Sequence, residues 1–446
     1  MDAVNSAPAA ATGDYEADAA AFSAFWCNAR DQLDRLPAKA QRDAAAVGAA
    51  EALKQAARDA RFIFLRVHAR TLYDRLTDGR RKFVRIERLA YAAADAVPGL
   101  VPTRAEISAE SDLRQSEKEG LEIDQGILFN QFLADPTCGL HLCHAMLLPR
   151  EESAEALAKF LRDGRLDLGT AKVERQGKAA VLLLSNPRFL NSEDVSTQLA
   201  TEVGADVCIL DPQSEVAVLR GDVVPTGKYA GRRVYNSGIN LTHLYHGRIP
   251  FLWFLIRDMG FVNKIVRGVA RPDVAPDEVM GDSIEKLWIS AVDTFAIGGG
   301  CQILLATDFN IAARDAYMTL PARREGIIPA MANLRLARFI GDRMARQAIM
   351  YERRFDCDSA EGRLICDEVV EPDAIDRTID HVVSRLTGSG VVGAIGNRRA
   401  LRLAAEPLDL FRRYAALYAR EQALCHFSPA LIINLEHHWN AQNRRA

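Results

Sequence analysis

The chain has 446 residues, of which 49% are hydrophobic and 26% are charged, and its formal net charge is −3. This length is more than one ordinary hydrophobic core requires, so we expect a soluble globular protein of two or three domains. The sequence has no block of like charge that would indicate a nucleic-acid partner, and no apolar run of the roughly 18–20 residues that a membrane span needs.

The first stretch of the chain, residues 1–20, is rich in alanine and carries four acidic residues. It has neither the basic start nor the apolar stretch of a secretory signal, so we predict a disordered tail. The eight cysteines are scattered along the chain and do not form a disulfide framework, which favours a reducing cytoplasm.

A helical pattern follows, from residue 21 to residue 168. Helices are predicted in chain order over residues 51–77, 81–96 and 151–161, the first of them ending at Asp78-Gly79. Thr103 and Glu106 have the spacing of a capping box, which marks the start of a further helix. We therefore predict an all-helical N-terminal domain over 21–168.

At Gly169 the hydrophobic period changes to that of strands. Residues 171–175 and 179–185 predict a β-hairpin, and further strand-like runs lie at 205–210, 215–220, 283–292 and 309–312. Strands that alternate with helices predict a layered α/β core over 169–371. From residue 372 the pattern is helical again, so we predict a C-terminal helical segment over 372–446.

The most informative motif is a glycine run, Ala296-Ile297-Gly298-Gly299-Gly300-Cys301-Gln302, between a strand pattern and the start of an apolar helix. Three glycines at such a junction let the backbone approach a ligand and leave amide N–H groups uncovered. Such amides can stabilise a developing oxyanion, so the motif predicts an enzyme that forms an enolate.

Several ordered segments carry a family resemblance. They are the stretch 289–313 with its glycine run and Asp308, the element Ser237-Gly238-Ile239-Asn240-Leu241, Pro321 with Gly326-Ile327-Ile328-Pro329, and the stretch 355–370. On these motifs residues 170–372 resemble the crotonase (enoyl-CoA hydratase/isomerase) superfamily. The resemblance implies a crotonase-like β/β/α spiral core, and it places two oxyanion amides on Ile239 and Gly299.

The chain departs from the hydratases of that superfamily at their two catalytic glutamates. The matching positions hold Gln302 and Ala322, and neither an amide nor a methyl group can exchange a proton at neutral pH. Hydratase chemistry is therefore excluded. Glu325 lies three residues further on and could be a replacement, but we interpret it as a solvated loop residue.

The long N-terminal helical region, Gln302 and the C-terminal extension most resemble superfamily members that are cofactor-free oxygenases of arylacetyl-CoA thioesters. This resemblance implies that O2 and an acyl-CoA thioester are substrates, and that no metal, flavin or haem is a cofactor. It also implies a homo-hexamer built as a dimer of trimers through the helical segment after residue 372. Two alternatives stay open: a crotonase-type thioesterase or decarboxylase, and a non-catalytic CoA-binding protein.

Four polar side chains are candidates for the substrate site besides Gly238, which belongs to the first oxyanion element. Gln302 could bind a phenol or a peroxide, or be a packed amide. Arg257 follows an apolar run, so it could bind ring hydroxyls, or be an arginine at a helix terminus, or pair with Asp258 at the surface. Glu193 could line the acyl pocket, or cap a helix beside Ser192. Arg188 could contact a CoA phosphate or be solvated.

Oxygen is small and apolar, so a dry pocket should hold it beside the reacting carbon. Its candidate walls, each of which could also be ordinary core, are Ile297, Leu304, Ile327 and Ile328. The cysteines and histidines in residues 138–144, together with His243 and His246, are residue types that could bind a metal ion. The cysteine and histidine side chains of residues 138–144 could not all coordinate one ion from a single short helix. We therefore predict no metal.

Overall fold

The computed structural model describes residues 10–444, and these residues form two compact units. Of the described residues, the first unit contains 10–146, 242–255 and 408–444, and the second contains 147–241 and 256–407. The units therefore do not follow the linear order of the chain, because the last helices belong to the same unit as the first ones.

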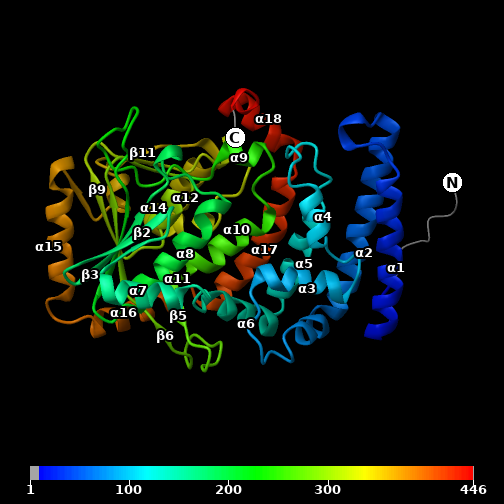
Figure 1. Cartoon of the computed structure of the whole chain (residues 1–446), viewed down its shortest axis with the longest axis horizontal. Coiled ribbons are helices and arrows are strands. Elements are labelled where there is room, and N and C mark those ends of the chain that lie inside the picture. The colour runs from blue at the N-terminus through cyan, green and yellow to red at the C-terminus, as the bar shows by residue number, and fades with distance from the viewer. Residues whose placement is uncertain (1–9, 445–446) are drawn as a thin grey trace. The chain divides into compact units, whose positions relative to one another are not determined.

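The first unit is helical. Its helices are α1 (Tyr15–Asp34), α2 (Ala44–Leu76), α3 (Ile86–Ala96), α4 (Arg104–Ala109), α5 (Ile123–Ala134), α6 (Pro136–Leu147), α9 (Leu241–Tyr245), α17 (Leu408–His426) and α18 (Pro429–Trp439). The helix α2 packs against α1 and α5, and α17 packs against α5 (Figure 1). Helix α10 (Phe251–Arg257) contains residues of both units.

The helix ends and the capping box predicted from the N-terminal sequence agree with the helices of this unit. The helix predicted over 51–77 is the C-terminal part of α2, and Asp78 and Gly79 both have the positive φ that ends it. The capping box of Thr103 and Glu106 is present at the start of α4. The predicted tail covers residues 1–20, but α1 already begins at Tyr15, with Asp14 as its cap. Residues 1–9 of the predicted tail lie outside the described residues.

The second unit is built on a mixed sheet of seven strands in the order β1-β2-β3-β4-β7-β9-β12. Its strands are β1 (Arg165–Asp167), β2 (Ala171–Gln176), β3 (Ala179–Leu184), β4 (Val216–Gly221), β7 (Leu287–Val292), β9 (Phe309–Ala313) and β12 (Glu368–Val370). The β1-β2-β3 pairings are antiparallel and the others are parallel, so the predicted hairpin is confirmed.

Two smaller sheets complete the strands of this unit. One has the order β11-β10-β8, with β8 (Phe295–Ile297) parallel to β10 (Tyr317–Thr319) and β11 (Phe355–Asp356) antiparallel to β10. The other pairs β5 (Val269–Ala270) with β6 (Ser283–Ile284). The helices of the unit are α7 (Ser153–Asp163), α8 (Val195–Leu210), α11 (Asn263–Arg267), α12 (Gly299–Leu304), α13 (Ala322–Glu325), α14 (Ala332–Tyr351), α15 (Ile375–Thr387) and α16 (Val392–Ala405), with a π-helical turn η3 (Asp258–Val262) after α10.

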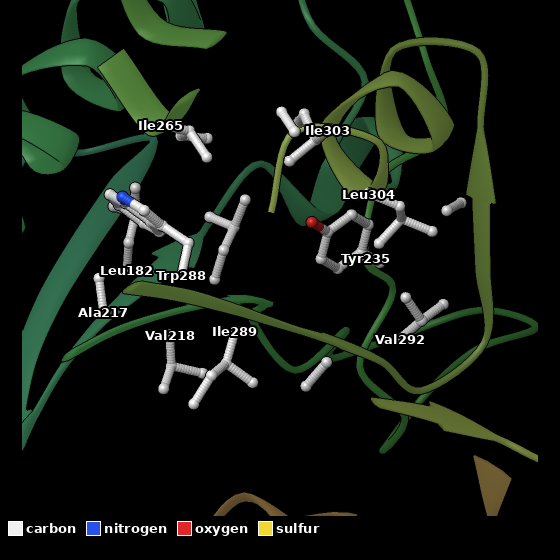
Figure 2. Packing of buried hydrophobic residues seen from close by; sticks show 14 of the residues in the cluster. Leu182, Ala217, Val218, Tyr235, Ile265, Trp288, Ile289, Val292, Ile303 and Leu304 are labelled. Atoms are coloured by element: carbon white, nitrogen blue, oxygen red, sulfur yellow. The ribbon is translucent and has the colours of Figure 1, made fainter. Parts of the chain in front are cut away.

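The core of the second unit lies on both faces of the seven-stranded sheet. Trp288 and Ile289 are neighbours on β7 and point to opposite faces, Trp288 beside Leu182 and Ile289 beside Val218 (Figure 2). All six residues of β7 are buried, as a central parallel strand covered on both sides requires.

One strand prediction is wrong. Residues 205–210 are the C-terminal part of α8, which begins at a capping box of Asp194 and Thr197. Most of this run is buried because α8 packs against β2 and β3 (Figure 1). A short run that is apolar on all sides has no period from which helix and strand can be told apart.

Within residues 10–444, none of the helices is both long and apolar enough to cross a lipid bilayer.

Candidate functional site

A buried ion pair lies next to the glycine run. Arg257, which ends α10, is only 5% exposed. Its guanidinium donates to both carboxylate oxygens of Glu193, in a loop before α8, with Nη2 3.0 Å from Oε1. It also donates to the carboxylate of Asp258 at 2.7 Å and to the carbonyl oxygen of Gly299 at 3.1 Å. The planar donor group of arginine is thus almost fully used inside the protein.

The positive charge of Arg257 lies next to the carboxylates of Glu193 and Asp258. Burial alone would lower the pKa of the Arg257 guanidinium, but the carboxylates of Glu193 and Asp258 raise it above its ordinary value. Asp258 is the first residue of the π-helical turn η3, and such turns are frequent at functional sites. The surface pairing considered for Arg257 and Asp258 is therefore wrong: both groups are buried.

Gln302 belongs to the same cluster. Its side-chain oxygen accepts a hydrogen bond of 2.8 Å from Arg257 Nη1, and the residue is 9% exposed on α12. Among the residues that the structure describes, its carboxamide nitrogen has no acceptor. The amide is therefore not satisfied by backbone, and its N–H groups are available to a ligand.

Glu193 ties the first glycine element to this cluster through its backbone. Its N–H donates to the carbonyl oxygen of Gly238 and its carbonyl oxygen accepts from the N–H of Asn240, both at 2.8 Å. The cap of α8 is the neighbouring Asp194, whose carboxylate accepts from the N–H of Ser196. Glu193 is thus free of the capping role, and its side chain turns to Arg257.

Asn236 connects three parts of the site. Its side-chain nitrogen donates to Glu193 Oε1 at 2.6 Å, and its side-chain oxygen accepts from the N–H of Gly238 at 2.7 Å. Its backbone forms an isolated parallel bridge to Ala296 in β8, where Ile297 N–H donates to the Asn236 carbonyl at 3.0 Å. The two glycine elements therefore run side by side.

The two amides proposed from the sequence lie on these adjacent segments. A methyl group built on Gly238, which has φ +84°, would lie 3.6 Å from the nitrogen of Gly299. Gly299 is the first residue of α12, so its N–H has no partner within the helix. Within residues 10–444, no acceptor is found for the N–H of Gly299 or of Ile239.

The glycine run is required by close contacts at more than one position. A Cβ on Gly299 would lie 2.9 Å from Arg257 Nη2, and a Cβ on Gly300 would lie 2.8 Å from the Cβ of Asn236. Gly298 has φ +52° and ψ −110°, a conformation that side chains rarely adopt. The run thus packs against the ion pair and also leaves its first helical amide uncovered.

The remaining predicted site residues are more dispersed. Arg188 is exposed, and its guanidinium lies over the ring of Phe189 at 5.0 Å. Leu304 is fully buried in the main core, and Ile297 packs against a smaller cluster around Phe295. Ile327 and Ile328 are half-buried after α13. The structure thus places these four apolar residues in different surroundings.

The interpretation of Glu325 as a solvated loop residue is wrong. It is the last residue of α13 and is only 7% exposed. A methyl group on Gly298 would lie 3.8 Å from Glu325 Oε1, so the carboxyl group lies beside the glycine run. Burial, together with the nearby charge of Glu352, raises the pKa of Glu325 to about 8.

Two site residues were not singled out from the sequence. Asn236 comes directly before the Ser237-Gly238 element, but nothing in its identity marks the side chain as a connector. Asp258 was noted only as a surface partner of Arg257. A pair of opposite charges at the end of a long apolar run was the available signal, since such charges are buried only when paired.

The cysteine and histidine run at 138–144 has a structural use in the first unit. The ring of His141 stacks on Phe83 with 4.6 Å between centroids, and its Nδ1 lies 2.8 Å from the hydroxyl of Tyr73. Cys138 and Cys143 are buried in α6. These side chains are therefore occupied by packing and hydrogen bonds.

Comparison with known proteins gives a consistent family likeness. Residues 278–394 match the family described as enoyl-CoA hydratase/isomerase. The chain is 46% identical over 393 residues to a (3,5-dihydroxyphenyl)acetyl-CoA 1,2-dioxygenase of Amycolatopsis orientalis, covering 88% of this chain and 89% of that protein. It is 26% identical to a short-chain-enoyl-CoA hydratase of Clostridium acetobutylicum, over 53% of this chain and 82% of the hydratase.

Among solved structures, the chain is similar to an enoyl-CoA hydratase from Mycobacterium avium subsp. paratuberculosis K-10. That likeness has a TM-score of 0.49 and 18% sequence identity, and covers 60% of this chain and 98% of the hydratase.

Proposed function

Because the chain is an oxidoreductase of the enoyl-CoA hydratase/isomerase (crotonase) family, we propose that it is a dioxygenase of an arylacetyl-CoA thioester. In this proposal it converts (3,5-dihydroxyphenyl)acetyl-CoA and O2 into (3,5-dihydroxyphenyl)glyoxylate and free CoA. The observation that carries the proposal is the 46% identity to the dioxygenase over 88% of this chain. Gln302 and Ala322, at the positions of the hydratase acids, argue against hydration.

The first step is the formation of an enolate. The thioester oxygen accepts hydrogen bonds from the N–H groups of Ile239 and Gly299, for which the described chain offers no other acceptor. These donors stabilise negative charge as it develops on that oxygen, which makes the neighbouring Cα–H more acidic. The aryl ring delocalises the same charge.

The buried cluster binds the ring hydroxyl groups. Glu193 accepts a hydrogen bond from one hydroxyl, and the free N–H of Gln302 donates to a hydroxyl or to the peroxide that forms later. Arg257 holds the side chain of Glu193 in place through two hydrogen bonds. A compensated charge pair can receive a neutral phenol without leaving an uncompensated charge behind.

The oxygen chemistry uses the electrons of the substrate, so the proposal includes no metal, flavin or haem. The Cα carbanion transfers its electron pair to O2 and forms a C–O bond, which gives a peroxide on Cα. The peroxide attacks the thioester carbonyl, and the CoA thiolate leaves. Loss of the second Cα proton then breaks the O–O bond, so that the ketone and the carboxylate each keep one atom of O2.

The other predicted residues have supporting places in this scheme. In the proposal, Ile297, Leu304, Ile327 and Ile328 remain candidate walls for O2 beside Cα, although Leu304 lies in the main core and Ile297 packs against a separate cluster. Gly238 lets the thioester approach the amide of Ile239, and the exposed Arg188 contacts a phosphate of CoA.

An isotope experiment tests the proposed function. The chelator-treated protein is incubated with (3,5-dihydroxyphenyl)acetyl-CoA under 18O2, and the product is weighed by mass spectrometry. We expect an arylglyoxylate with two labelled oxygens and one equivalent of free CoA. Release of CoA without oxygen consumption would show a thioesterase, and activity restored only by added iron would overturn the cofactor-free reaction.

We also propose that the enzyme assembles as a hexamer, a dimer of trimers, through the helices that follow residue 372. Light scattering coupled to size-exclusion chromatography checks the mass against six times 49.2 kDa.

A further inference from the structure

The backbone of the second unit brings Glu325 to the glycine run. Strands β8 and β10 are parallel, and the N–H of Gly298 donates to the carbonyl oxygen of Thr319, the last residue of β10, at 2.8 Å. Helix α13 begins shortly after β10 and ends at Glu325, where Gly326, with φ +73°, turns the chain away. The carboxyl group therefore lies beside Gly298, whose successor carries the uncovered amide.

The side chain of Glu325 is buried without a stabilising partner. Within residues 10–444 its carboxyl group makes no hydrogen bond and no ion pair, although the residue is only 7% exposed. The charge that acts on it is another carboxylate, Glu352 at the end of α14, which is paired with Arg324. Burying such a group costs free energy, and nothing in the described fold offsets that cost.

The other carboxylates near the glycine run already accept hydrogen bonds from neighbouring side chains. The carboxylate of Glu193 accepts from Asn236 and Arg257, and that of Asp258 also accepts from Arg257. Both carboxylates are thus engaged by N–H donors, and Gln302 has no proton-accepting group at neutral pH. Glu325 is therefore the carboxyl group beside this run that is not held by a cation or an amide.

We propose that Glu325 is the base that removes the proton from Cα of the thioester. This inference rests on the proposed function and names the residue that completes its first step. A methyl group on Gly298 would lie 3.5 Å from the Cα of Gly238 and 3.8 Å from Glu325 Oε1, so one carbon atom can lie in ordinary contact with the carboxylate there. Because burial raises the pKa of Glu325 to about 8, its ionised form is a stronger base than an ordinary carboxylate.

The step is balanced within the site. The Cα–H bond breaks, its proton bonds to a carboxylate oxygen of Glu325, and its electron pair moves toward the thioester oxygen held by the two amides. The resulting neutral carboxylic acid no longer carries an uncompensated buried charge. The proton then leaves with the CoA thiol, and the electron pair reduces O2.

Exchange of the Cα protons tests this role apart from the oxygen chemistry. (3,5-dihydroxyphenyl)acetyl-CoA is incubated anaerobically with the enzyme in D2O, and deuterium at Cα is followed by NMR and mass spectrometry. We expect the wild-type enzyme to catalyse exchange and the Glu325→Gln variant to lose about 10²–10³-fold, since general base catalysis contributes this much. Glu325→Asp, which keeps a carboxylate, should recover part of the rate.

The matched control is Glu352→Gln, the same change in the neighbouring carboxylate, which should exchange within a few-fold of the wild type. Exchange by Glu325→Gln at the wild-type rate, with oxygen consumption intact, would overturn the role of Glu325 and leave the proposed function standing. A wild-type enzyme that neither exchanges protons nor consumes oxygen would overturn both. Melting followed by circular dichroism verifies that the variants fold.

Discussion

At the scale of single residues, the site is organised around Arg257. This one side chain contacts both carboxylates of the cluster, the amide oxygen of Gln302 and the carbonyl oxygen of Gly299. A buried charge pair of this kind adds little net stability compared with apolar side chains, but removal of one partner leaves an uncompensated charge. Loss of the Arg257 side chain should therefore lower the stability of the fold.

The substitution Arg257→Met should lower the free energy of unfolding by about 3–5 kcal/mol, because Glu193 and Asp258 lose their counter-charge. Arg188→Met is the matched control: this arginine is exposed, so stability should change by less than about 0.5 kcal/mol. Chemical denaturation of the two variants and the wild type measures the difference. Equal stability of Arg257→Met and the control would show that the cluster is not compensated as described.

At the scale of elements, three segments from distant parts of the sequence are hydrogen-bonded to one another at the candidate site. Residues 236–240 bridge to Glu193 on one side and to β8 on the other, and the glycine run continues β8 into α12. This arrangement holds the amides of Ile239 and Gly299 side by side through hydrogen bonds of their neighbours. In the proposed reaction, the positions of both amides are thereby set before substrate binds.

The variant Gly299→Pro removes one of these two amide hydrogens and should lower the rate of Cα-proton exchange by about 10²–10³-fold relative to Gly299→Ala. The alanine variant is the proper reference, because its Cβ meets Arg257 as the proline ring does but its N–H remains. Anaerobic exchange of the two variants in D2O measures the ratio. A ratio near one would mean that the amide of Gly299 does not contact the thioester oxygen.

The glycine run and the element at 237–241 could be found from the sequence because backbone conformation and close approach demand glycine there. The contacts between side chains could not be found from the sequence. Whether Arg257 pairs at the surface or inside depends on the turn η3, and whether Glu325 is solvated depends on how β10 pairs with β8. Both are long-range outcomes that the local pattern does not contain.

At the scale of the whole molecule, two buried carboxyl groups make stability depend on pH. Burial raises the pKa of Glu122, in the first unit, to about 7, and that of Glu325, in the second, to about 8. The ordinary value for both is 4.5. Because the folded chain binds these protons more tightly than the unfolded chain, stability is highest at low pH within this window and falls as pH rises.

Between about pH 3 and pH 6.5 the buried His426, whose pKa burial lowers from 6.5 to about 3, contributes the opposite slope. The free energy of unfolding should therefore decrease between about pH 6.5 and pH 8 in the wild type, and Glu122→Gln and Glu325→Gln should each reduce that slope. Since the two groups lie in different units, their effects should add within about 0.5 kcal/mol in the double variant. Urea denaturation at several pH values measures these slopes. A slope that Glu325→Gln leaves unchanged would show that this carboxyl group titrates normally.

The two units divide after Met146 and after Pro407, and these boundaries do not coincide with the changes of hydrophobic period near Gly169 and residue 372. The presence of helical and strand-rich stretches could be anticipated from those changes of period. The grouping of the last helices with the first ones could not, because nothing in residues 408–446 specifies that α17 packs on α5. The apolar face of an amphipathic helix indicates that the helix packs against another element, but it does not identify that element.

The bridges that join Glu193 to Ile239, and Asn236 to Ala296, also bear on refolding. Each closes a long loop, and contacts of high sequence separation form late because chain entropy opposes them. Helix content should thus return well before catalytic competence when the denatured protein is diluted into buffer. Recovery of turnover is then a sensitive reporter of the last native contacts, and no isolated fragment that ends before the glycine run can be active.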